Sequence, residues 1–379
     1  MKLVILIPDG MCDVQYEELG GLSPAEYART PGMDEMVRRG SVGLMKTMHD
    51  GLPLGSLVGI MGIYGYYPPQ YVPRGRSIFE SYALGLKTNP DDLVCRCNIV
   101  KVNSSGVLED FTAGQISNEL ARAYLDDVQI PSGFEIYHDN SYRNVLICRE
   151  EEIDDTQLEL FEPHECMGLS IDNILPRFKG EIYKPFVDMM SRSVRGDLML
   201  WPWGAGRIRN FPPMPYRSMT ITGLSFLYGM ATALGGKAII PDGATGYRGS
   251  NLNAKFKAAM DHLDDVDVCL IHCNAPDEEA HVHNVVGKAQ SIADIDSQII
   301  QPLLQYLETY SEPCRIVLLP DHYTVCDTGK HLPDLVPYVI FGEGIDSNHS
   351  LKGYSETGII NSAPPVMDSH HLIQFHLGK

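Results

Sequence analysis

Short apolar runs, each ending in a polar or turn-forming residue, recur at both ends of the chain. A run of this kind is typical of a strand buried on both faces of a sheet. The four clearest runs are Leu3–Pro8, Val266–His272, Arg315–Leu319 and Tyr338–Phe341. Between them, Leu252–Leu263 and Gly287–Leu307 keep the spacing of an amphipathic helix. This alternation predicts an α/β fold built on a doubly wound, mostly parallel sheet.

The middle of the chain follows a different pattern. Val94–Val100 is strand-like, Ile116–Leu125 is helical, and Phe134–His138 with Arg143–Cys148 forms a possible two-stranded unit. We interpret residues 92–197 as a smaller α+β domain inserted into a core domain of residues 1–91 and 198–379. An insert of about a hundred residues has the size of a typical small domain.

The composition narrows the possible partners. The chain has 49 acidic and 30 basic side chains, giving a net charge of −19, which argues against binding to nucleic acid or to an anionic membrane. No apolar stretch reaches the ~18 residues of a transmembrane helix, and no signal-peptide core is recognisable. Nine cysteines without a Cys-x-x-Cys pair favour neither a disulfide framework nor a thiolate zinc site. We therefore expect a soluble cytoplasmic protein.

Acidic and histidine side chains follow three of the predicted strands. The carboxyl ends of strands are where open α/β sheets bind ligands, and the spacing of Asp277 and His281 puts both on one face of a helix. Each residue alone is more readily explained as a helix cap or a solvated loop residue. Together they make a set of three carboxylates and three imidazoles that suits Mn²⁺ or Zn²⁺ better than Ca²⁺. The set is Asp9, Asp277, His281, Asp321, His322 and His331.

A candidate nucleophile lies in the segment Gly51–Gly65, where a Gly/Pro-rich loop runs into an apolar stretch at Ser56. A serine at this point is also a good helix N-cap. If metal ions are bound nearby, the helix N-terminus and the ions would together favour attack of the hydroxyl on a phosphoryl group.

Nine ordered motifs resemble the cofactor-independent (2,3-bisphosphoglycerate-independent) phosphoglycerate mutases of archaeal type, in the alkaline phosphatase superfamily. The resemblance extends over nearly the full length and implies an alkaline-phosphatase-like core with an inserted lid or substrate domain. The motifs are IPDGM at Ile7–Met11, the loop around Ser56, RGR at Arg74–Arg76, DFTAG at Asp110–Gly114, SYRN at Ser141–Asn144, WPWGAGR at Trp201–Arg207, GATGY at Gly243–Tyr247, APDEEAH at Ala275–His281 and PDHYTVCDTGKH at Pro320–His331.

The resemblance implies two divalent metal ions, Mn²⁺ or Zn²⁺, and a small phosphorylated substrate. One ion would be bound by Asp277, His281 and His331. The other would be bound by Asp9, Asp321, His322 and the nucleophile Ser56. Ser56 would take the phosphoryl group from 3-phosphoglycerate and return it to give 2-phosphoglycerate, with no requirement for 2,3-bisphosphoglycerate. Arginines hold the anionic groups of such substrates, and the candidates are Arg76, Arg143 and Arg207, which are about as readily explained by surface salt bridges.

The chain departs from the family pattern at two places. Where the family has Ser-Asp-x-x-Asn, Leu57 and Ile60 replace the acid and the amide, and Gln115 stands where the family has a histidine. Glutamine cannot act as a general acid or base. These changes leave open a metal-dependent phosphomonoesterase, a phosphotransferase resembling the relatives proposed as homoserine kinases, and a catalytically silent protein that binds a phospho-ligand.

Overall fold

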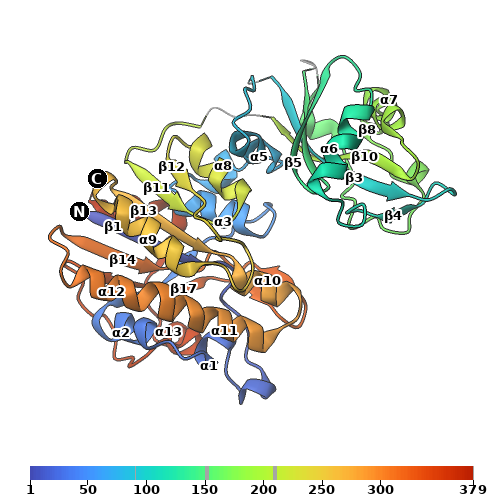
Figure 1. The fold of residues 1–379 in the computed structure, drawn as a ribbon. Coiled ribbons are helices and arrows are strands. Elements are labelled where there is room, and N and C mark those ends of the chain that lie inside the picture. The colour runs from blue at the N-terminus through green and yellow to red at the C-terminus, as the bar shows by residue number, and fades with distance from the viewer. Residues whose placement is uncertain (90, 150–152, 208–210, 379) are drawn as a thin grey trace. The chain divides into compact units, whose positions relative to one another are not determined.

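The computed structural model describes residues 1–89, 91–149, 153–207 and 211–378. The chain divides into two compact units, residues 1–72 with 211–379 and residues 73–210. Figure 1 shows the ribbon of both units and labels many of their helices and strands. None of the helices in the described part of the chain is long and apolar enough to cross a membrane.

The first unit is built on an eight-stranded sheet. Its strands, in spatial order, are β12 (Lys237–Ile239), β11 (Ser218–Ile221), β13 (Val268–Cys273), β1 (Lys2–Pro8), β14 (Cys314–Leu318), β17 (Val336–Gly342), β2 (Ser41–Lys46) and β18 (Val366–Asp368). All neighbouring pairs are parallel except the two that involve β17. The predicted mostly parallel α/β sheet is therefore confirmed, with each of the four apolar runs forming one of its strands.

Helices bury this sheet. Val4 and Leu6 of β1 join one hydrophobic core with residues of α2, α9, α11 and α12. The alternate residues Leu3, Ile5 and Ile7 point to the opposite face and are also fully buried. The helices of this unit are α1 (Pro24–Tyr27), α2 (Pro31–Arg39), α3 (Ser56–Ile63), α4 (Pro68–Tyr71), α8 (Ser225–Ala233), α9 (Leu252–His262), α10 (Ala275–His281), α11 (Val285–Ile295), α12 (Gln301–Leu307), α13 (Glu356–Asn361) and α14 (Leu372–Leu377).

The helix predicted over Gly287–Leu307 is continuous but irregular. A π-helical stretch, Asp296–Ile300, joins α11 to α12. Its first residue, Asp296, accepts hydrogen bonds from the backbone of Gly32 and Met33 in the first turn of α2. The π-helical turn thus begins at the buried carboxylate that caps the N-terminus of α2.

The second unit is an α+β structure with an antiparallel sheet. The strands are β10 (Leu198–Arg207), β3 (Leu93–Val102), β6 (Arg143–Cys148) and β5 (Phe134–Asn140) in spatial order, with β4 (Leu108–Asp110) also paired to β3. The further elements are α5 (Ser77–Ala83), α6 (Asn118–Asp127), α7 (Lys184–Ser193) and the short strands β7 (Leu158–Glu159), β8 (Arg177–Phe178) and β9 (Glu181–Ile182). The helices α6 and α7 contribute to its hydrophobic core together with Leu93, Cys95 and Cys97.

This unit is longer at both ends than the segment 92–197 inferred from the sequence. At one end, α5 contacts β3, β6 and β10, so it belongs with this sheet. At the other end, β10 pairs with β3 from Leu198 to Arg207. Both segments were assigned to the core from the sequence because pairing between distant strands leaves no local signal.

Candidate active site

Three neighbouring parallel strands bring the acidic residues together. The strands β13, β1 and β14 are adjacent in the sheet, and their carboxyl ends meet at one edge. Asp9 directly follows β1, Asp277 lies in α10 just after β13, and Asp321 follows β14. Asp9 and Asp321 are completely buried and Asp277 is nearly so. The local sequence pattern therefore leads to a compact cluster of three carboxylates at the carboxyl edge of the sheet.

A first group of possible metal ligands consists of Asp277, His281 and His331. Asp277 and His281 are one helical turn apart in α10, and the carboxylate Oδ2 lies 3.2 Å from His281 Nε2. His331 comes from the hairpin β15 (Tyr323–Val325) and β16 (Lys330–Leu332). Its Nε2 lies 3.4 Å from Asp277 Oδ1 and 3.2 Å from His281 Nε2. All three ligand atoms are within 4.8 Å of one another.

Main-chain carbonyls orient the two imidazoles of this group. His281 Nδ1 lies 2.8 Å from the carbonyl of Gly329, and His331 Nδ1 lies 3.1 Å from that of Leu54. A carbonyl only accepts, so both Nδ1 atoms carry the proton. In the neutral tautomers, the Nε2 lone pairs then face each other across 3.2 Å. Two facing lone pairs beside a carboxylate suit a bound cation, and metal-binding histidines use this arrangement of the second nitrogen.

A second group surrounds Asp9. His322 Nε2 lies 3.2 Å from Asp9 Oδ1 and 3.4 Å from Asp321 Oδ2. The compact ligand set here is Asp9, Asp277 and His322, whereas the sequence resemblance implied Asp321 in place of Asp277. Asp321 Oδ1 accepts the backbone N–H of Gly10, while its buried Oδ2 has no hydrogen-bond partner in the described structure. Its contact with His322 Nε2 is too long for a good hydrogen bond, so this buried carboxylate oxygen is suited to binding a cation.

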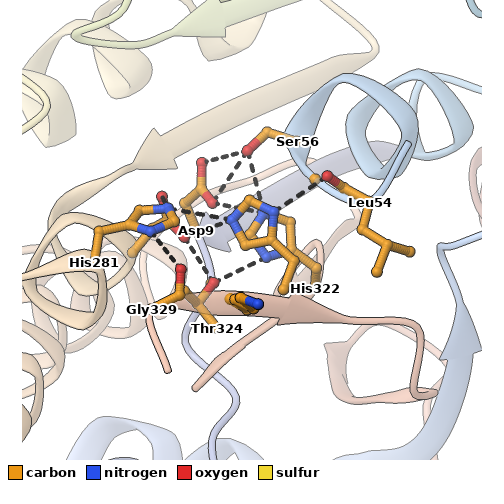
Figure 2. A network of polar contacts seen from close by, with 12 residues as sticks. Asp9, Leu54, Ser56, His281, His322, Thr324 and Gly329 are labelled. Carbon is orange, nitrogen blue, oxygen red and sulfur yellow. Dashed lines mark hydrogen bonds and ion pairs between the residues drawn. The ribbon is translucent and has the colours of Figure 1, made fainter. Parts of the chain in front are cut away.

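Ser56 is the first residue of α3 and points to this second group (Figure 2). Its Oγ lies 3.0 and 3.2 Å from the two carboxylate oxygens of Asp9 and 3.2 Å from His322 Nε2. Gly55 before it has a φ of 137°, and a Cβ there would lie 3.1 Å from His331 Nδ1. Glycine therefore permits both the turn into α3 and the close approach of His331.

The electrostatics of the cluster favour a cation. Burial and the charge of Asp277 raise the pKa of Asp9, but hydrogen bonds from His272 and His322 outweigh them and leave this pKa at about 2. Burial and the nearby Asp9 raise the pKa of Asp321 to about 6. Burial lowers the pKa of His322, but the carboxylates of Asp321 and Asp9 raise it to about 10. Protonated groups thus compensate an excess of buried negative charge, which divalent ions would also neutralise.

Two side chains of the site were not singled out from the sequence. His272, in β13, is completely buried, and its Nε2 lies 2.8 Å from Asp9 Oδ2. Thr324, in β15, donates to Asp277 Oδ1 at 2.6 Å and lies 3.1 Å from His322 Nδ1. It therefore connects the two ligand groups. A histidine inside an otherwise apolar buried strand was the available signal for His272, whereas a threonine in a loop-like stretch gave none.

The second unit contains the candidate arginines. Arg96 and Asn98 point to the face of β3 opposite Cys95 and Cys97. Burial lowers the pKa of Arg96 to about 10; Glu80, whose carboxylate lies 3.2 Å from its Nε, opposes this shift, and the charges of Arg76 and Arg143 add to it. Arg76, Arg96 and Arg143 therefore share one region of this unit.

Arg207 makes different contacts. Its guanidinium donates to the main-chain carbonyls of Asp91 and Ile153. These bonds tie the end of β10 to neighbouring loops. Arg96 therefore lies nearer to Arg76 and Arg143 in charge contact, whereas Arg207 is engaged with the loops. No sequence motif indicated Arg96.

The three departures from the family pattern lie in different environments. Leu57 is half-buried and Ile60 is completely buried within α3. Gln115 is exposed in the second unit and has a positive φ of 57°, as have Ala113 and Gly114 before it. Asp110 stabilises this unusual turn by accepting the backbone N–H groups of Thr112 and Gly114.

Comparisons with known proteins agree with the motifs. A family model described as 2,3-bisphosphoglycerate-independent phosphoglycerate mutase matches residues 37–195. Proteins of that name from Methanosarcina mazei and Methanothrix thermoacetophila are 31% and 33% identical to this chain, over 98% and 99% of both chains respectively.

Two solved structures share the fold. A protein from Pyrococcus horikoshii matches with a TM-score of 0.78 and 23% identity, over 99% of this chain and 96% of that one. A cofactor-independent phosphoglycerate mutase from Thermoplasma acidophilum matches with a TM-score of 0.65 and 19% identity, over 99% and 98% of the two chains.

Proposed function

Because the chain belongs to the 2,3-bisphosphoglycerate-independent phosphoglycerate mutase family, we propose that it interconverts 3-phosphoglycerate and 2-phosphoglycerate through a phosphoserine at Ser56. The observation that carries the proposal is the position of Ser56 Oγ, within 3.2 Å of Asp9 and His322 at the first turn of a helix. Asp9 accepts the hydroxyl hydrogen there, which leaves lone pairs of Oγ available for attack on phosphorus.

Two divalent ions, Mn²⁺ or Zn²⁺, fit the donor set. Asp277, His281 and His331 would hold one of them. Asp9, His322 and Ser56 would hold the other, with Asp321 Oδ2, which accepts no hydrogen bond in the described structure, or the shared carboxylate of Asp277 completing the set. Bound there, the ions would neutralise the phosphate and lower the pKa of the serine hydroxyl.

The phosphoryl transfer itself takes place at Ser56, which Asp9 and the N-terminus of α3 assist. Ser56 Oγ forms a bond to phosphorus while the bond from phosphorus to the substrate oxygen breaks, and the serine proton finally resides on the departing hydroxyl. The return step reverses this with the other hydroxyl of glycerate. Asp9 orients the serine through its hydrogen bond, and the N-terminal N–H groups of α3 favour the phosphate charge. No 2,3-bisphosphoglycerate is needed, since Ser56 itself carries the phosphoryl group between the two positions.

Arginines of the second unit would bind the anionic groups of the substrate. We assign this role to Arg143 and Arg76 and add Arg96, which lies among them. Arg207 is a weaker candidate because its guanidinium already donates to two carbonyls. Charge-assisted hydrogen bonds from arginine suit carboxylate and phosphate alike.

We place the reaction in the cytoplasm. All nine cysteines are free and buried. Disulfide bonds are rare in reducing compartments, so a protein whose cysteines are all free thiols fits the cytoplasm.

A phosphomonoesterase is the second candidate. It is favoured by the apolar side chain of Leu57 beside the nucleophile and by the non-ionisable Gln115. Neither side chain can pass a proton to or from a glycerate hydroxyl. In a phosphomonoesterase, water rather than glycerate would remove the phosphoryl group from Ser56.

One assay separates these functions. The purified protein, loaded with Mn²⁺, is incubated with 3-phosphoglycerate, and 2-phosphoglycerate and free phosphate are measured separately. Isomer without phosphate supports the mutase. Phosphate without isomer supports the phosphomonoesterase, and neither product would point to another acceptor or a silent protein.

The covalent step is tested with Ser56→Ala. This variant should lose transfer almost completely while keeping its fold, since only one half-buried hydroxyl is removed. Ser225→Ala is a matched control, because Ser225 is exposed and also begins a helix. Full activity in Ser56→Ala would contradict the phosphoserine route.

A further inference from the structure

The imidazole of His272 is oriented differently from those of the candidate metal ligands. His281 and His331 direct Nδ1 at main-chain carbonyls, which leaves Nε2 facing the ligand groups. His272 directs Nε2 at Asp9 Oδ2, 2.8 Å away, and its Nδ1 lies 3.5 Å from the hydroxyl of Thr222. All of these contacts are formed within the first unit.

The neighbours of His272 determine which of its nitrogens donates. Thr222 Oγ1 already accepts the backbone N–H of Leu224 at 3.1 Å, so its own hydrogen is available for His272 Nδ1. With Nδ1 as acceptor, the neutral ring has its proton on Nε2 and donates it to Asp9. A nitrogen that donates to a carboxylate has no lone pair for a metal ion. His272 is therefore a partner of a ligand and is not itself a ligand.

The chain of contacts is anchored at both ends. Thr222 follows β11, His272 lies in β13 and Asp9 follows β1, so the hydrogen bonds cross three adjacent strands at their carboxyl ends. Thr222, His272 and Asp9 are all completely buried. Lys255 Nζ also donates to the carbonyl of His272 at 2.9 Å and fixes its backbone. A donor held in this way restricts the rotation of the Asp9 carboxylate.

We propose that His272 is a positioning residue, which holds the Asp9 carboxylate in the orientation that binds a divalent metal ion beside Ser56. This inference rests on the proposed function, because it takes Asp9 as a metal ligand. Partners of metal ligands typically change metal affinity by about 10- to 100-fold. The test therefore measures metal binding directly, in the absence of substrate.

The experiment compares three substitutions by chelator-competition titration with Mn²⁺. His272→Leu removes the donor, and one of the two metal equivalents should bind about 10- to 100-fold more weakly. His272→Gln places an amide N–H at the same number of bonds from the backbone and should restore most of the affinity. His376→Leu is the matched control, because His376 is also buried and neither of its ring nitrogens has a hydrogen-bond partner in the described structure.

Stability is measured on the metal-free proteins by thermal melting. A purely structural role would lower the melting temperature of His272→Leu and leave its metal affinity at the parent value. Thr222→Val provides a second test that removes a single hydroxyl, and it should weaken the same metal equivalent to a smaller extent. If His272→Leu does not fold, parent affinity in Thr222→Val overturns the proposal.

The outcomes distinguish this inference from the proposed function. Weak metal binding in His272→Leu that is restored in His272→Gln supports positioning by His272, even if the protein proves to be no mutase. Parent-like binding of both metal equivalents in a folded His272→Leu protein overturns the positioning role, even if mutase activity is present. In active protein, excess Mn²⁺ should also recover much of the kcat of His272→Leu.

Discussion

Gly10→Ala should disrupt the proposed metal site because this glycine lies against two of its side chains, Thr324 and Asp277. Gly10 follows Asp9 and has a φ of 57°. A Cβ at this position would lie 2.4 Å from Thr324 Oγ1 and 2.7 Å from Asp277 Oδ1. Ordinary van der Waals contact begins at 3.4 Å, so the threonine hydroxyl has to withdraw by about 1 Å and the Asp277 oxygen by about 0.7 Å. Metal–ligand distances tolerate only about 0.2 Å.

The expected magnitude follows from the bond that is broken. Thr324 donates to Asp277 at 2.6 Å, and a hydrogen bond to a charged group contributes about 1.5–3 kcal/mol. Loss of a partner of a metal ligand typically weakens metal binding by about 10- to 100-fold, and we expect a fall of that size for the ion proposed at Asp277. In addition, a side chain in the left-handed region costs about 1–2 kcal/mol of folding free energy.

Gly20→Ala separates these two effects. Gly20 has a φ of 71°, but no atom lies within 4 Å of the position that a Cβ would take there. Both variants should lose about 1–2 kcal/mol of stability from backbone strain, and Gly10→Ala should lose more because its Cβ also displaces Thr324, as measured by urea unfolding of the metal-free proteins. Only Gly10→Ala should bind Mn²⁺ more weakly in a chelator-competition titration. Equal Mn²⁺ affinities in the two variants would show that the space at Gly10 does not control the metal site.

Three further outcomes follow from the structure. Lys288→Met should lower the free energy of unfolding by about 3–5 kcal/mol in urea titrations, because it leaves the buried carboxylate of Asp13 without its partner. In the parent, the Lys288 ammonium lies 2.9 Å from Asp13 and also donates to two main-chain carbonyls. A loss below about 1 kcal/mol would contradict this reasoning. Burial raises the pKa of Glu356 from 4.5 to about 7. The folded protein therefore keeps this proton at pH values where the unfolded chain has lost it, and its contribution to the free energy of unfolding is fully present below pH 4.5 and is lost as the pH rises through 7. Glu356→Gln should therefore gain stability relative to the parent between pH 4.5 and 8, by at most about 3 kcal/mol, and a difference independent of pH would exclude this assignment. Chelation of divalent metal should lower the melting temperature, with Mn²⁺ at 100 times its Kd restoring about 3 kcal/mol; identical melting in both conditions would argue against a metal site.

The sequence alone determined the central sheet and most of the candidate ligands. Buried strands such as β1 need continuous apolar runs, so their positions are visible in the local pattern. Asp9, Asp277 and Asp321 follow such strands, and the carboxyl ends of neighbouring parallel strands meet. Their convergence could be expected once the sheet was predicted.

Only the tertiary structure revealed the groups that support these ligands. His272 and Asp9 are 263 positions apart, and Thr324 meets Asp277 across a separation of 47. The extent of the second unit was equally hidden, because β10 joins it through pairing with β3. Hydrophobic periodicity records which face of an element is buried, whereas hydrogen bonds between distant side chains depend on how the elements pack. The sequence therefore predicted the chemistry of the candidate ligands, and the packing decided which side chains hold them in place.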